Sequence, residues 1–208
     1  MKPYRLPFTL LRIQCCVLVL FVMSACFQSC RESPGAPIKD FYNKEFGWSV
    51  DIPEGFDSVP PAQWAKMQNK GANAIENTYD VDVENNARQI FVFNSDQFNY
   101  FEANWQPADS SGEDYAELFR SVNDMVYHSF EVQMPQAKLD SAYGQEKIDG
   151  LEFQTFSIGM KIGDMNMRLH MFSRLFGKKE FTVNIMTVDG EKEKRLLEAW
   201  RRSEFEGR

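Results

Sequence analysis

The second half of the chain alternates apolar and polar residues in a way that predicts successive strands. Four such segments lie at 137–148, 151–162, 165–176 and 179–188, and the pairs Asp149-Gly150, Gly163-Asp164 and Gly177-Lys178 separate them. Short turns of this kind reverse the chain, so the four strands run antiparallel. Segment 151–162 has apolar residues on both parities, which indicates a strand that is covered on both faces.

The first half of the chain contains further extended segments. Phe46, Trp48, Val50 and Ile52 alternate with smaller or polar neighbours, which predicts a half-buried strand that ends at Pro53. Segments 88–94 and 99–105 also read as strands, and the four residues between them are few enough for a hairpin. Residues 61–75 predict a short, weak helix.

Two longer segments have helical periodicity. In 110–130, Ser111 and Asp114 form a capping box, and six residues recur at helical spacing: Tyr115, Leu118, Phe119, Val122, Met125 and Val126. A final helix is expected at 191–205, with Asp189 as its N-cap. Its acidic residues come early and its arginines late, as the helix dipole favours.

This order of elements predicts one α+β domain over residues 40–208. We expect an antiparallel sheet with helices packed on it, and more finely a three-layer α/β/α sandwich. The predicted core consists of Leu118, Val122, Phe153, Leu169, Phe181, Val183, Ile185, Leu197 and Trp200.

The opening "FGWSVDIPEGF", the order of elements and a closing amphipathic helix that ends in "SEF" give the body a family resemblance. Residues 40–206 resemble the PsbP-like fold, which is known from an extrinsic protein of photosystem II and occurs in many bacterial lipoproteins. The resemblance implies the architecture and favours an accessory role, but it brings no functional residue to this chain.

The cysteines are confined to the N-terminal part of the sequence. Cys15, Cys16, Cys26 and Cys30 all precede residue 31 of the 208. A disulfide framework, a cysteine-based metal site and a cysteine nucleophile are therefore excluded from the folded body. A body without thiols suits an oxidising compartment.

The first 25 residues have the organisation of a signal peptide. Positive residues precede an apolar run at 13–23, which is too short to span about 30 Å of hydrocarbon. "VMSAC" then resembles the lipobox of bacterial lipoproteins, with Met23 where Leu is usual. The resemblance implies that residues 1–25 are removed and that Cys26 carries the lipid. Cys30 is the alternative, and an ordinary signal or an uncleaved anchor stays open.

The lipid implies where the protein resides. Acyl chains such as palmitate contribute about 0.8 kcal/mol per buried CH₂, which holds a domain on a bilayer. Residues 26–39, rich in Pro and Gly, are expected to form a flexible tether. In the bacterial lipoproteins that the sequence resembles, Asp after the acylated Cys favours the inner membrane. Phe27 follows Cys26 here, so the resemblance implies the outer membrane, with the body facing the periplasm. Loss of residues 1–25 changes the net charge from −7 to −10, which argues against nucleic-acid binding.

The histidines and a group of aromatic residues are candidate site residues. His128 is expected to be exposed, and strand alternation separates His170 from Met165, Met167 and Met171, so a soft-metal site is disfavoured. The aromatic residues Phe98, Tyr100, Phe101 and Trp105 are expected to be core or edge packing, with a ligand groove as the alternative.

Two further patterns are weak. Asp80, Asp82 and Glu84 resemble the start of a calcium loop, but Asn85 and Phe91 break the pattern, so a solvated acidic segment is expected. The triplets at 57–59 and 140–142 resemble Asp-Ser-small acceptors of O-glycosylation.

These observations predict a membrane-anchored envelope protein with a non-catalytic binding or accessory domain. We expect no catalytic residues, no cofactor and no metal, and the protein or small-molecule partner is not specified. The alternative is an envelope hydrolase that uses paired carboxylates, which requires two such groups roughly 5–10 Å apart in a cleft.

Overall fold

The computed structural model describes residues 39–66, 76, 78, 86–108 and 115–207. The predicted signal peptide at 1–25, Cys26, Cys30 and most of the expected tether at 26–39 lie outside the described residues. So do the acidic segment around Asp82 and the capping box at 111–114. One compact unit comprises Pro37–Arg208, and its first described residue, Lys39, already belongs to a strand.

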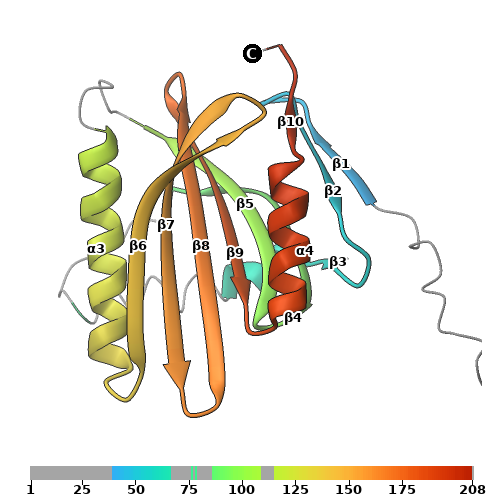
Figure 1. The fold of residues 1–208 in the computed structure, drawn as a ribbon. Helices are drawn as coiled ribbons and strands as arrows, with labels where there is room; N and C mark the ends of the chain where they lie inside the picture. The colour runs from blue at the N-terminus through green and yellow to red at the C-terminus, as the bar shows by residue number, and fades with distance from the viewer. Residues whose placement is uncertain (1–38, 67–75, 77, 79–85, 109–114, 208) are drawn as a thin grey trace, which may run out of the picture. The chain divides into compact units, whose positions relative to one another are not determined.

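A seven-stranded sheet dominates this unit (Figure 1). In spatial order it consists of β3 (Asp57–Ser58), β4 (Arg88–Asp96), β5 (Asn99–Pro107), β9 (Lys179–Thr187), β8 (Met165–Phe176), β7 (Leu151–Ile162) and β6 (Lys138–Ile148). Every neighbouring pair is antiparallel. The predicted meander of four strands and the hairpin of β4 and β5 are therefore confirmed.

The turn between β6 and β7 shows why the meander was readable from sequence. Asp149 and Gly150 both have positive φ, 48° and 76°. An Asp-Gly pair tolerates this left-handed backbone, and two such residues make the tight turn that matches the twist of a hairpin.

A small second sheet contains β1 (Lys39–Asn43), β2 (Trp48–Ile52) and β10 (Glu204–Phe205). Helix α4 runs over Gly190–Arg201, and Asp189 accepts hydrogen bonds from the backbone N–H groups of Glu191 and Lys192. The predicted cap is confirmed, but the expected helix end at residue 205 is wrong. The chain leaves the helix after Arg201 because Phe205 pairs with Trp48 and is buried there.

One face of the large sheet packs against α4 and the small sheet. The cluster between them is rich in aromatic side chains, with Trp48, Trp200 and Phe181 fully buried. The rings of Trp48 and Trp200 meet edge to face with their centroids 6.1 Å apart. Phe153 of β7 belongs to the same cluster.

The opposite face carries α3 (Tyr115–Gln133), which packs on β6 and β7. Phe119 is 6% exposed and contacts a second cluster that includes Phe156, Ile158, Met160 and Leu169. The prediction that Leu118 and Val122 lie in the core is wrong, because their side chains are 51% and 50% exposed. The other seven predicted core residues are buried.

The inward face of α3 was misjudged because it contains polar residues. Asn123 and Ser129 are buried, and each side chain bonds to the carbonyl four residues earlier, on Phe119 and Met125. Such back-bonding satisfies a small polar group inside a helix interface. The spacing of apolar residues leaves out these two polar positions, so the buried face that it predicts for α3 is rotated relative to the observed one.

The predicted α+β class, an antiparallel sheet with helices packed on it, is confirmed by this arrangement. Apolar contacts on both faces of β7 also match the expectation. Strands dominate, and α4 shares its side with the small sheet, so the three-layer sandwich stays a prediction.

Candidate functional site

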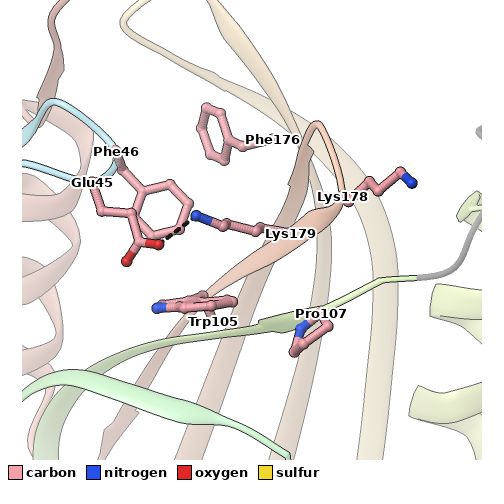
Figure 2. A pocket seen from close by; sticks show the side chains of 7 residues that line it. All are labelled: Glu45, Phe46, Trp105, Pro107, Phe176, Lys178 and Lys179. Atoms are coloured by element: carbon pink, nitrogen blue, oxygen red, sulfur yellow. Dashed lines mark hydrogen bonds and ion pairs between the residues drawn. The ribbon is translucent and has the colours of Figure 1, made fainter.

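A pocket of about 360 Å³ opens where three distant parts of the chain meet (Figure 2). We call this cavity the Trp105 pocket. It is lined by Glu45, Phe46, Trp105, Pro107, Phe176, Lys178 and Lys179. They come from the turn after β1, the end of β5 and the β8–β9 hairpin.

The turn after β1 is fixed by a close backbone contact. Gly47 has φ of 58°, and a Cβ there would lie 2.7 Å from the carbonyl oxygen of Glu206. Only glycine fits such an approach without displacing the backbone. The turn therefore brings Phe46 against Phe176 and Trp105, with ring centroids 5.5 and 6.4 Å away.

Cations surround the indole of this pocket. The Lys179 Nζ lies 4.9 Å from the Trp105 ring centroid and forms an ion pair with Glu45. Arg88, from the neighbouring strand β4, places its Cζ 4.7 Å from the same centroid. Within the described residues, Lys178 makes no ion pair. The pocket thus combines apolar walls with a positive rim.

The four clustered aromatic residues do not form one groove. Strand alternation sends Phe101 and Trp105 to the α4 side, while Tyr100 packs against Trp64 on the other side. Phe98 is exposed in the β4–β5 turn. Burial raises the pKa of Tyr100 well above its ordinary value. Core or edge packing is therefore confirmed for Tyr100, Phe101 and Trp105, and of the four only Trp105 also lines this pocket.

The histidines have partners that the sequence did not reveal. His170 Nε2 lies 2.7 Å from the Glu193 Oε1 of α4, and His128 Nδ1 lies 3.3 Å from Glu131. His128 is exposed, as predicted. Met167 and Met171 pack in the cluster beneath α3, away from the side chain of His170, so the predicted separation is confirmed.

One buried and one half-buried carboxylate on the α3 side of the sheet were missed by sequence reasoning. Glu102, only 5% exposed, accepts hydrogen bonds from the Trp64 indole at 2.8 Å, from Asn184 at 3.2 Å and from Asn104 at 3.3 Å. Glu180 accepts from three hydrogen-bond donors, on Tyr115, Ser173 and Gln106.

The two glutamates occupy different parts of the sheet. Glu102 pairs with Asn184, and Glu180 pairs with Gln106, so four residues of strand separate them. This corresponds to about 14 Å along the backbone, which is wider than the carboxylate pair of a glycosidase. Asp40 and Asp51 are opposite each other on the small sheet, and partial desolvation together with the adjacent Asp40 carboxyl raises the pKa of Asp51, but both residues are exposed.

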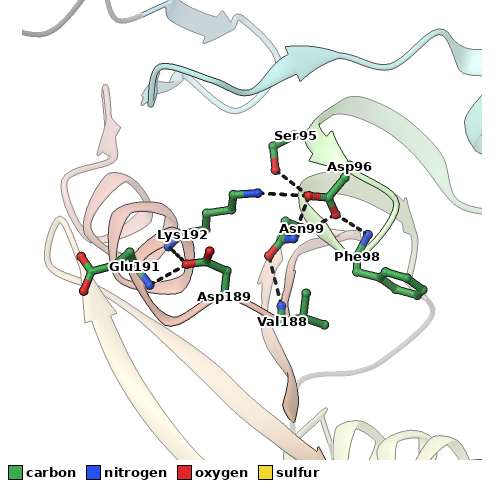
Figure 3. Close-up of polar contacts among 8 residues, drawn as sticks. All are labelled: Ser95, Asp96, Phe98, Asn99, Val188, Asp189, Glu191 and Lys192. Carbon is green, nitrogen blue, oxygen red and sulfur yellow. Dashed lines mark hydrogen bonds and ion pairs between the residues drawn. The ribbon is translucent and has the colours of Figure 1, made fainter. Parts of the chain in front are cut away.

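A polar cluster joins the β4–β5 hairpin to the start of α4 (Figure 3). Asp96 accepts hydrogen bonds from the Phe98 N–H, the Asn99 amide and the Lys192 ammonium. Burial opposes ionisation, but these donors outweigh it and lower the pKa of Asp96 to about 2. Asn99 in turn accepts from the Val188 N–H. This cluster therefore links the β4–β5 hairpin to the start of α4.

A second pocket of about 280 Å³ lies on the meander. We call this cavity the meander pocket. It is lined by Lys138, Leu139, Asp140, Gly159, Met160, Lys161, Asn166, Met167 and Arg168.

The two possible acceptor triplets for O-glycosylation contain Ser58 and Ser141. Both serines are exposed, and their modification stays a prediction.

The described part of the chain contains neither a candidate metal site nor a helix that could span a membrane. No group of three His, Cys, Asp or Glu residues there is arranged to hold a metal ion. No described helix is both long and apolar enough to span a bilayer.

No protein-family model matches this sequence, and no curated protein matches it. Among solved structures, the solution structure of cyanobacterial PsbP (CyanoP) from Synechocystis sp. PCC 6803 is similar, with a TM-score of 0.53 and 13% identity. The match covers 86% of this chain and 98% of that one. The body has a PsbP-like fold. At this identity the likeness shows the fold alone.

A crystal structure from Bacteroides thetaiotaomicron VPI-5482 gives a TM-score of 0.47 and 13% identity over 83% of this chain, which spans about half (51%) of that protein. The similarity to the cyanobacterial structure confirms, for the body, the PsbP-like fold expected from the "FGWSVDIPEGF" opening and the element order.

Proposed function

We propose that the protein is a lipoprotein of the cell envelope. Residues 1–25 are removed, Cys26 carries the lipid (with Cys30 as the alternative), and the outer membrane holds the body on its periplasmic side. The order of positive residues, apolar run, small pair and cysteine supports this proposal. The acidic body supplies no electrostatic attraction to anionic lipid, so the acyl chains provide the attachment.

We propose further that the PsbP-like body is a non-catalytic binding module, with helices α3 and α4 as the outer layers of an α/β/α arrangement. The Trp105 pocket is the single observation that carries this function. Apolar walls with a few placed polar groups are typical of ligand sites. The Trp105 pocket and the meander pocket each contain one carboxylate, Glu45 or Asp140, so neither of them matches the paired arrangement of the hydrolase alternative.

The chemistry of the Trp105 pocket favours an anionic ligand with a flat apolar body. A ring stacks on Trp105 or Phe176, and the anionic group meets Lys178 at the rim. A small molecule or the side chain of a partner protein carries these features equally well.

Binding of anilinonaphthalenesulfonate, which combines flat rings with a sulfonate, tests the pocket. We expect Lys178→Glu to weaken binding of this probe by about tenfold, because one favourable charge contact becomes repulsive. Lys147→Glu is the matched control, since Lys147 is exposed and lies in neither pocket. Equal losses in the two variants would mean that the probe responds to net charge and would refute the site.

Photocrosslinking in cells tests the same site for a protein partner. A crosslinker at position 178 should capture a defined species, whereas one at the exposed Phe98 position should not. Identical captures at both positions would argue against a partner at this pocket.

Mass spectrometry of membrane-extracted protein tests the anchor separately. The expected N-terminus is an acylated Cys26, and Cys26→Ala should prevent processing at that site. An intact Met1, or a mature terminus without acyl mass, would contradict the lipoprotein proposal but leave the binding module unaffected.

A further inference from the structure

The meander pocket contains an unusual arrangement of positive charge for an acidic protein. Lys138 of β6 and Lys161 of β7 are directly opposite each other in the antiparallel register, and Asn166 of β8 is opposite Lys161. Like charges at directly opposed positions destabilise a sheet. Neither lysine forms an ion pair within the described part of the chain, so no direct carboxylate contact there offsets the repulsion.

Arg168 adds a third cation to this pocket. It is opposite Gly159 on β7, which is two residues along the strand from Lys161 and on the same face of the sheet. Its nearest carboxylate, Glu193 of α4, lies 4.0 Å from its Nε, and its side chain is 54% exposed. About half of the Arg168 side chain is therefore exposed to solvent. Three cations thus converge on one hollow of the sheet.

A single carboxylate lies among these cations. Asp140 is the register partner of Gly159, and a Cβ on Gly159 would lie 2.6 and 2.7 Å from its two carboxylate oxygens. The carboxylate is therefore laid flat over the glycine, which is buried beneath it. No described residue donates a hydrogen bond to Asp140, although Lys138 and Arg168 line the same pocket.

We propose that the meander pocket binds a zwitterionic phosphate ester, in which an ammonium group is close to the phosphate. Lys138, Lys161 and Arg168 hold the phosphate oxygens, and Asp140 accepts the hydrogen bonds of the ammonium. Lysine and arginine are the residues that bind phosphate most commonly in proteins. Residues two apart on a strand point to the same face and are about 7 Å apart. Long lysine side chains span this distance.

This inference is independent of the Trp105 pocket, which is lined by other residues at other strand ends. The chemistry is shared by free phosphoethanolamine and by the headgroup of an ethanolamine phospholipid. The two sources are separated by experiment.

Isothermal titration calorimetry of the full chain in detergent tests the proposal, with phosphoethanolamine, inorganic phosphate and ethanolamine as probes. We expect phosphoethanolamine to bind about tenfold more tightly than either of the others, because it meets the cations and the carboxylate at once. Lys161→Gln should weaken its binding by about tenfold, and Lys147→Gln should leave binding unchanged. Equal affinity for phosphate and phosphoethanolamine, or binding unaffected by Lys161→Gln, would overturn the proposal.

Two further variants isolate the role of Asp140. Asp140→Asn should remove the preference for phosphoethanolamine over phosphate. Gly159→Ala keeps the carboxylate but forces it away from its present position, because the added Cβ would overlap it, and should remove the same preference. Retention of the preference in both variants would refute the ammonium contact.

A stability measurement without ligand distinguishes binding from a structural role. Relief of the like-charge pair predicts that Lys161→Gln raises the melting temperature of the unliganded protein while it weakens binding. A lowered melting temperature would identify Lys161 as a structural residue instead.

Bilayer discs of phosphatidylethanolamine and of phosphatidylcholine separate the two sources of ligand. If the lipid headgroup occupies the pocket, free phosphoethanolamine should bind about tenfold more weakly to the full chain in the first disc than in the second. Equal affinity in both discs would assign the pocket to the free ester.

Discussion

The two faces of the large sheet are stabilised in different ways. The face beneath α4 and the small sheet is packed with aromatic rings, among them Trp48, Phe181 and Trp200. The face beneath α3 has a smaller cluster that relies on methionine and on hydrogen-bonded polar groups such as Glu102 and Asn123. Leu118 and Val122 on α3 are exposed.

The indoles show how strongly the aromatic face depends on burial. The Nε1 groups of Trp48 and Trp200 are buried without a hydrogen-bond acceptor, and an unpaired donor costs about 1–3 kcal/mol. Burial of 150–250 Å² of ring at about 25 cal/mol/Å² contributes roughly 4–6 kcal/mol. Apolar burial therefore outweighs the lost bonds, whereas on the α3 face Trp64 donates its indole N–H to Glu102.

Truncation on the aromatic face should have the largest effect. Trp200→Ala removes a fully buried ring at the centre of that cluster. We expect it to lower the free energy of unfolding by about 4–5 kcal/mol, measured by urea denaturation. A loss below about 2 kcal/mol would mean that this face is not the main source of stability.

Adjacent residues on α3 give a matched comparison. Phe119→Ala should cost about 3 kcal/mol, because Phe119 is buried against the sheet. Leu118→Ala, on the exposed face, should change stability by less than about 0.5 kcal/mol. A larger loss for Leu118 than for Phe119 would reverse the orientation assigned to α3.

The polar network on the α3 face should lose stability when the Glu102 carboxylate is replaced by an uncharged amide. Glu102→Gln replaces one acceptor oxygen by an amide group that itself donates, opposite donors on Trp64, Asn104 and Asn184. The expected loss is about 2 kcal/mol. Glu117→Gln at an exposed position is the control. Equal stabilities of the two variants would show that the network contributes little.

The Asp96 cluster predicts a small, directional dependence on pH. The folded pKa of about 2 lies below the ordinary value of 3.8. The stabilisation is therefore complete above about pH 4 and is lost as pH falls through 2. Because the side chain is 42% exposed, solvent screening limits the effect to less than about 1 kcal/mol. Asp96→Asn should flatten this part of the stability profile, and an unchanged profile would contradict the assignment.

Local signals explain what the sequence predicted well. The four-stranded meander followed from alternation and turn pairs such as Asp149-Gly150, and the Asp189 cap followed from residue type alone. These features depend on neighbours along the chain. The same is true of the separation of His170 from the methionines, which strand alternation dictates.

The remaining features depend on contacts between distant segments. Strand β10 exists because Phe205 is buried against Trp48, which overrides the helical periodicity of the preceding residues. The Trp105 pocket requires Glu45 to meet Lys179, which is 134 residues later. Glu193 reaches His170 from a separate helix. No local pattern contains these pairings, and the resemblance of residues 22–26 to a lipobox, which is a local pattern, stays a prediction.

The central claim is that the body binds its ligand at the Trp105 pocket, and the indole N–H resonances of the protein test it most directly. The chain has four tryptophans, so a nitrogen–proton correlation spectrum of the full chain in detergent reports on each environment separately. Titration with anilinonaphthalenesulfonate should shift the Trp105 resonance and leave the other three in place, including that of Trp64, whose indole is bonded to Glu102. A Trp105 resonance that does not move, or four resonances that move together, would contradict the account.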